Sequence, residues 1–189
     1  MMFRSAVLWV ALVAIGACTN ANDLDEAPVD LGDFRLGHNI VVAPNLTRGP
    51  TSRAASAEEW IVMLQDAIDA RFGRYEGAAL YHLGVSVEGY VLGRPGVPVI
   101  ASPKSFLVLR VTAWDDAAGA KLNREPRQIT VFESLSGDTI LGSGLTQSKR
   151  EQMANLSRNA AKRIETWLRH QHRGRGWFAR GPRRDAAAQ

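Results

Sequence analysis

The side chains best suited to bind a metal or to perform acid–base chemistry are four histidines. They are His38, His82, His170 and His172. A zinc site needs three or four converging ligands, usually at recognisable short spacings. Only the last two histidines are close in sequence, and their Arg- and Gly-rich surroundings favour a solvated pair. His82 lies on the polar side of an expected strand, which is typical of a surface or rim residue. We therefore expect no metal ion and no cofactor.

Nucleophilic catalysis requires an activated serine, threonine or cysteine beside a base. The sequence has no Gly-x-Ser-x-Gly motif, and the "GSG" at residues 142–144 is better explained by a strand that tolerates a close backbone approach. Asp115 and Asp116 are adjacent carboxylates, but neighbours on an extended chain point to opposite sides, and a turn explains the pair. The sequence therefore predicts that the protein is not an enzyme.

Cys18 is the one cysteine of the chain, and it follows the most apolar stretch of the sequence. Residues 6–17 are all apolar or small, and Arg4 precedes them. A positive start, a short apolar run and small residues at its end are typical of a secretory signal peptide. We expect residues 1–17 to be this signal, which is too short to be an ordinary membrane-spanning helix.

The four residues Ile15-Gly16-Ala17-Cys18 resemble the lipobox of bacterial lipoproteins. In that family the peptide is cut before the cysteine, whose sulfur receives a diacylglycerol and whose amine is acylated. The resemblance implies a lipid anchor of the palmitate type on Cys18, with the chain facing the periplasm. Thr19 follows where an Asp retains some family members at the inner membrane, so the outer membrane is favoured. Several acyl chains anchor a protein stably, whereas one chain binds only marginally.

Charge is distributed unevenly along the chain. Residues 18–161 contain 14 Lys and Arg against 17 Asp and Glu, whereas residues 162–189 contain 8 basic and 2 acidic side chains. The pI of about 9.6 therefore reflects the C-terminal end. This asymmetry, together with export, argues against nucleic acid as a partner.

The basic end of the chain predicts either a disordered, solubilising tail or a contact with an anionic surface. Arginine pairs with phosphate groups bidentately, and tryptophan favours the membrane interface. The candidate contacts are Arg173, Arg175, Trp177, Phe178, Arg180, Arg183 and Arg184.

Two helices are predicted by capping boxes and apolar stripes. Ser56 and Glu59 begin the first, which Gly73 is expected to close in the left-handed conformation. A second capping box begins a helix over residues 148–169. Alternating apolar residues predict the strands. These strands cover residues 34–44, 80–93, 105–114, 127–134 and 139–145.

This order predicts an α+β domain over residues 34–169, with an antiparallel or mixed sheet of four to five strands and two amphipathic helices packed on one face. The helix between the first two strands is a crossover that could make that pair parallel. The acidic residues 18–33 are expected to form a flexible tether, and residues 170–189 a disordered basic tail.

The order of "NIVVAPN", the first helix, "YHLGVSVEGYVLG", "SFLVLRVTAWDD", "ITVFESLSGDTILGSG" and the closing helix is similar to small periplasmic lipoproteins. These are of the TolB N-terminal domain and curli-secretion lipoprotein type. The resemblance covers roughly residues 34–168 and implies a non-enzymatic part of an envelope assembly, secretion or transport machine.

Two functions remain open from the sequence. The first is a lipid-anchored interaction or assembly module that binds envelope proteins or copies of itself, for example through sheet edges. The second is a binding protein that holds an apolar or lipid ligand between sheet and helices. An internal pocket would favour the second function, and a fully packed core the first.

Overall fold

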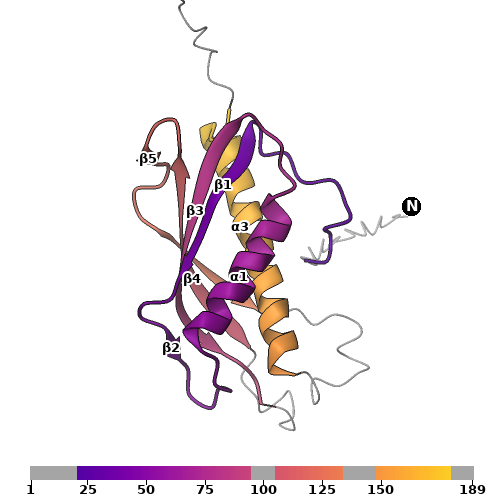
Figure 1. The fold of residues 1–189 in the computed structure, drawn as a ribbon, viewed down its shortest axis with the longest axis vertical. Helices are drawn as coiled ribbons and strands as arrows, with labels where there is room; N and C mark the ends of the chain where they lie inside the picture. The colour runs from indigo at the N-terminus through magenta and orange to yellow at the C-terminus, as the bar shows by residue number, and fades with distance from the viewer. Residues whose placement is uncertain (1–20, 95–104, 134–147, 180–189) are drawn as a thin grey trace, which may run out of the picture.

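The computed structural model describes residues 21–94, 105–133 and 148–179, which form two layers. One layer is a mixed sheet, and the other consists of two helices that lie side by side on one of its faces (Figure 1). The predicted fold class is confirmed. Over the described residues the sheet has six strands, because two additional strands of two residues each extend its edges.

The strands and helices have the following bounds. The first half of the chain contains β1 (Phe34–Val42), β2 (Thr47–Arg48), α1 (Ala57–Phe72) and β3 (Ala79–Val91). The second half contains β4 (Phe106–Asp115), β5 (Ala120–Lys121), β6 (Arg127–Phe132) and α3 (Lys149–Arg175). The strand predicted at residues 139–145 lies outside the described residues.

The centre of the sheet is formed by β3 and β4, which pair antiparallel. β1 pairs parallel with β3, and α1 is the crossover between them, as the element order predicted. On the other side of the sheet, β6 and the short β5 both pair antiparallel with β4. β2 continues the edge on the β1 side by pairing parallel with β3.

Both helices begin at the predicted capping boxes. Ser56 and Ser148 each accept a hydrogen bond from a backbone N–H three residues later, and the glutamate there accepts one from the serine backbone. The prediction for Gly73 was wrong. Its φ is −65°, and glycine is needed there because a Cβ would lie 2.7 Å from the Asp69 carbonyl oxygen. A left-handed glycine does cap the other helix, because Gly176 ends α3 at φ 70°.

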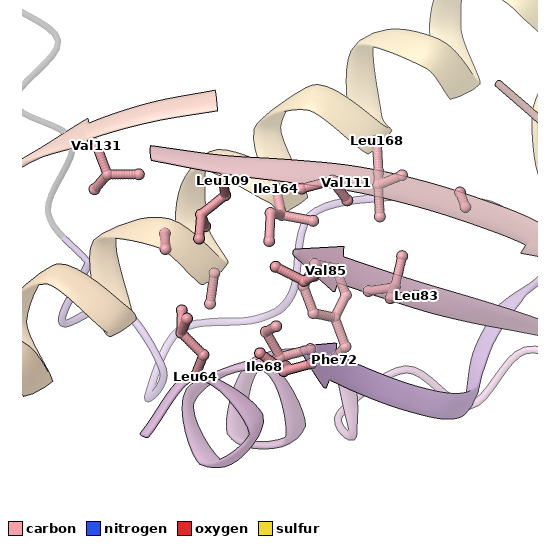
Figure 2. Packing of buried hydrophobic residues seen from close by; sticks show 14 of the residues in the cluster. Leu64, Ile68, Phe72, Leu83, Val85, Leu109, Val111, Val131, Ile164 and Leu168 are labelled. Carbon is pink, nitrogen blue, oxygen red and sulfur yellow. The ribbon is translucent and has the colours of Figure 1, made fainter. Parts of the chain in front are cut away.

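The core lies between the sheet and the two helices (Figure 2). Leu64, Ile68 and Phe72 point from α1 toward the sheet, in the i, i+4, i+8 pattern of one helix face. Ile164 and Leu168 of α3 meet the side chains of β3 and β4 from the same side. The sheet contributes Leu83, Val85, Leu109, Val111 and Val131.

None of the helices in the described part of the chain has the length and apolar composition needed to cross a bilayer.

Trp60 provides a test of this packing. Its side chain is fully buried against Tyr90, with ring centroids 5.3 Å apart. We expect Trp60→Ala to lower the free energy of unfolding by about 3–5 kcal/mol, because it leaves a large cavity. Val62→Ala is the matched control on the same helix, since Val62 is 55% exposed, and it should change stability little. Equal losses in urea denaturation would contradict the assigned helix faces.

Candidate functional site: the junction of the N-terminal segment with the two helices

A buried ion cluster joins α1, α3 and the segment before β1. Its centre is Arg71 in the last turn of α1, which is 1% exposed. The guanidinium donates to Glu165 Oε2 of α3 at 2.9 Å, to Asp23 Oδ1 at 2.6 Å and to the carbonyl of Ala21 at 3.1 Å. A buried guanidinium requires such partners because its desolvation is costly.

Glu165 is also buried, and both of its oxygens are satisfied. The Tyr75 hydroxyl donates to Oε1 at 2.9 Å, and Lys162 donates to Oε2 at 3.0 Å. Burial, reinforced by the charge of Glu165, raises the pKa of Tyr75 far above its ordinary range. Tyr75 is therefore a fixed hydrogen-bond donor that holds the carboxylate in place.

Asp23 connects the N-terminal segment to both helices, because it pairs with Arg71 and with Lys162. Burial alone would raise the pKa of Asp23. The hydrogen bonds and charges of its two cationic partners outweigh this effect and lower the pKa to about 2. The carboxylate is therefore ionised at neutral pH and takes a defined position on the helix layer.

The prediction that residues 18–33 form a flexible tether is wrong for residues 21–33, which pack on the domain. Arg74 donates to the carbonyls of Leu24 and Glu26, both at 2.8 Å, and Leu31 is fully buried. Backbone hydrogen bonds to arginine side chains replace the apolar contacts that this polar segment lacks.

The prediction that residues 170–189 form a disordered tail is wrong for residues 170–178. α3 continues to Arg175, and Trp177 and Phe178 are buried. The Phe178 ring lies 4.6 Å from that of Tyr81, and its carbonyl accepts from the N–H of Asp33 at 2.8 Å. An aromatic cluster holds Phe178 on the domain, because each ring removes a large apolar area from water.

The predicted anionic-surface residues therefore divide into three groups. Trp177 and Phe178 are buried, so they are corrected from surface contacts to core residues. Arg173 and Arg175 are exposed near the end of α3. The third group lies outside the described residues. It consists of Arg180, Arg183 and Arg184. The predicted lipidation site, Cys18, also lies outside the described residues.

His82 forms a second polar site on the other side of the sheet. Its Nε2 is 2.9 Å from Asp116 Oδ1, and its Nδ1 accepts from the backbone N–H of His38 at 2.8 Å. The His38 N–H thereby occupies the ring nitrogen that would act as a base toward a nucleophile. The contact holds β1 where its register shifts between Leu36 and Asn39. Within the described ranges, no three His, Cys, Asp or Glu side chains are grouped as metal ligands.

The sheet face opposite the helices carries exposed apolar side chains, and no described helix or strand covers it (Figure 1). We call it the open face. Phe132 is 55% exposed, and its ring lies 6.4 Å from that of Phe106. The Lys121 ammonium lies 5.4 Å from the centre of the Trp114 ring. The other large apolar side chains of this face are Ile40, Val42 and Leu80.

No family model and no curated protein matches the sequence. Among solved structures, the chain is similar to a DUF330 protein of Xanthomonas campestris, with 16% identity, 71% of this chain and 80% of that chain covered, and a TM-score of 0.41. The PelC dodecamer of Paraburkholderia phytofirmans has 15% identity, coverages of 69% and 89%, and a TM-score of 0.34. A minor lipoprotein of Acinetobacter baumannii has 18% identity, coverages of 68% and 92%, and a TM-score of 0.30. Likenesses at this level carry no information on activity.

Asp23→Asn tests the ion cluster through its pH dependence. The folded-state pKa of about 2 lies below the ordinary value of 3.8, so the carboxylate stabilises the fold above pH 3.8 and this contribution is lost as the pH falls toward 2. At pH 7 the substitution should cost about 2 kcal/mol, and the difference from the parent should shrink between pH 4 and 2. Urea denaturation at a series of pH values measures both effects.

Asp25→Asn is the matched control, because Asp25 is an exposed carboxylate of the same segment. It should leave the acid transition where the parent has it. If the two variants lost stability equally at pH 7, the role assigned to Asp23 would be wrong.

Proposed function

We propose that this chain is a lipid-anchored lipoprotein of the bacterial cell envelope whose domain is a non-catalytic interaction or assembly module. The observation that carries the proposal is the open face, where Phe132, Ile40 and Trp114 expose apolar surface on a sheet whose other side is closed by helices. Exposed apolar groups gathered on one side of a domain are typical of protein–protein contact surfaces.

The anchor of the proposed module is the acylated Cys18. The lipobox resemblance supports this assignment, and it implies a position facing the periplasm, at the outer membrane rather than the inner. Only Thr19 and Asn20 lie between Cys18 and Ala21, whose backbone carbonyl accepts a hydrogen bond from Arg71. The proposed lipoprotein is therefore held close to the bilayer, and its partners are envelope proteins or copies of itself rather than nucleic acid.

The packing of the core favours this proposal over a carrier of an apolar ligand. A carrier of that kind would hold its ligand between the sheet and the helices. In the described residues, side chains of both layers fill this interface (Figure 2). Leu64 and Ile68 of α1 and Leu109 of β4 are fully buried in it. The resemblance to the TolB N-terminal domain and the curli-secretion lipoprotein supports the hypothesis that this module belongs to an envelope assembly, secretion or transport machine.

Cys18→Ser tests the anchor. In a bacterial host with the lipoprotein pathway, the parent should incorporate radiolabelled palmitate and fractionate with membranes, because Cys18 is the only thiol available for acylation. The variant should incorporate none. Palmitate incorporation that is unchanged in the variant would exclude Cys18 as the acylated residue.

A photo-crosslinking residue at position 132 tests the open face. We expect adducts in intact envelopes when the probe replaces Phe132, and few when it replaces Val62, which is equally exposed but lies on α1. An adduct of twice the chain mass would identify a second copy, and any other mass an envelope partner. Adducts from position 62 with none from position 132 would refute the open face as the contact surface.

A further inference from the structure

The solvent-facing side of α3 carries a row of cationic side chains at intervals of four, seven and four residues. We call this the α3 cation row. Its members are Arg158, Lys162, Arg169 and Arg173. At about 100° per residue, these positions fall within about 60° of one another around the helix axis, and they extend over about 22 Å.

The three arginines of the row have no acidic partner in the described part of the chain, since none occurs in its ion pairs. Lys162 is the exception, because Asp23 and Glu165 neutralise it. The only other acidic residue of α3 is Glu151, which belongs to the capping box at the far end of the helix. The row therefore presents a charge of about +3 that is not balanced on its own helix.

The N-terminal segment crosses the α3 cation row near its middle. Asp23 pairs with Lys162, and the Ala21 carbonyl accepts a hydrogen bond from Arg71. The chain toward Cys18 therefore leaves the domain near the middle of the row. Figure 1 shows that the described chain starts on the helix side of the sheet, away from the open face. The three residue-to-residue steps from Cys18 to Ala21 can reach at most about 10 Å. A lipid on Cys18 would therefore keep the middle of the row within about 10 Å of the bilayer surface, which is close to the Debye length of ~8 Å at physiological ionic strength.

α1 is negatively charged on its exposed side, whereas the α3 cation row is positive. An anionic surface therefore suits the α3 side of the helix layer. Its exposed charged residues are Glu58, Glu59, Asp66 and Asp69, and its one arginine, Arg71, is buried. Exposed Asp25 and Glu26 lie near the C-terminal end of α1, where Arg74 holds the backbone of Glu26. An anionic surface attracts α3 and repels α1, so it selects one orientation of the domain.

We propose that the three arginines of the α3 cation row, Arg158, Arg169 and Arg173, dock on the phosphate groups of anionic phospholipids in the bilayer that holds the lipid of Cys18. The proposal rests on the lipid anchor described above and adds an orientation: α3 faces the bilayer and the open face points away from it. Arginine suits this role because its guanidinium binds phosphate oxygens bidentately. Each basic residue near an anionic surface strengthens binding about fivefold, so three arginines contribute about 100-fold.

Vesicle binding by the full mature chain with Cys18→Ser tests the row without the anchor. The vesicles contain phosphatidylcholine alone or with phosphatidylglycerol. Arg158→Gln, Arg169→Gln and Arg173→Gln together should weaken binding to the anionic vesicles about 100-fold. The matched control combines Arg35→Gln, Arg110→Gln and Arg127→Gln, which remove the same charge from exposed positions of the sheet.

The control should bind the anionic vesicles within about twofold of the parent, since the bilayer contact does not involve the sheet. An unchanged unfolding midpoint in urea verifies that each triple variant is folded. Equal weakening in the two triple variants, or none in the α3 variant, would overturn the proposal. Because this chain has no acyl group, its result is independent of whether Cys18 is lipidated.

The orientation is tested with the acylated protein, in which a single introduced cysteine is the only free thiol. A fluorophore on Thr166→Cys lies beside the row on α3, and one on Thr130→Cys lies on the sheet. In vesicles with phosphatidylglycerol, nitroxide-labelled lipids should quench the first label strongly and the second weakly. Equal quenching would refute the orientation. A failure of the anchor would instead appear as loss of both labels from the vesicles.

Discussion

The fold depends on one buried guanidinium, that of Arg71, which is surrounded by groups from three parts of the chain. Glu165 comes from α3, Asp23 and the Ala21 carbonyl from the N-terminal segment, and Arg71 itself from α1. A buried ion pair contributes little net stability, because desolvation offsets most of the attraction, but removal of one partner leaves an uncompensated charge. In this arrangement of the two helices and the N-terminal segment, Arg71, Asp23, Lys162 and Glu165 each have a partner of opposite charge.

Most of the fold could be predicted because its elements have strong local signals. The capping boxes at Ser56 and Ser148 mark both helix starts, and alternating apolar residues mark β3 and β4. The crossover through α1 indicated that β1 and β3 could pair parallel, and they do. The end of α3 was less predictable, because arginine and glycine after residue 169 dilute the apolar period although Gly176 supplies the required left-handed cap.

The candidate site was not predictable in the same way, because its contacts join residues far apart in sequence. Asp23 and Leu31 occur in a segment that is too polar to show a packing pattern, and their partners lie on the two helices. Arg71 next to Phe72 could have been a signal, since a cation on the apolar face of a helix requires a buried acid. Trp177 and Phe178 offered a second signal, for packing of the residues after α3, because two adjacent large aromatic side chains near a helix end are seldom both left exposed to water.

The polar nature of the cluster suits its proposed position next to a bilayer. A segment held only by apolar contacts would have to compete with acyl chains, which offer the same contacts at high local concentration. Ion pairs with Asp23 and Glu165 are not replaced by hydrocarbon, and burial of Arg71 keeps its guanidinium away from lipid phosphates that would otherwise compete for it. The arginines of the α3 cation row have no acidic partner in the described residues, and their side chains are half-buried or exposed. In the proposed position, α3 binds the N-terminal segment through Lys162 and contacts lipid phosphates through the three arginines of the α3 cation row.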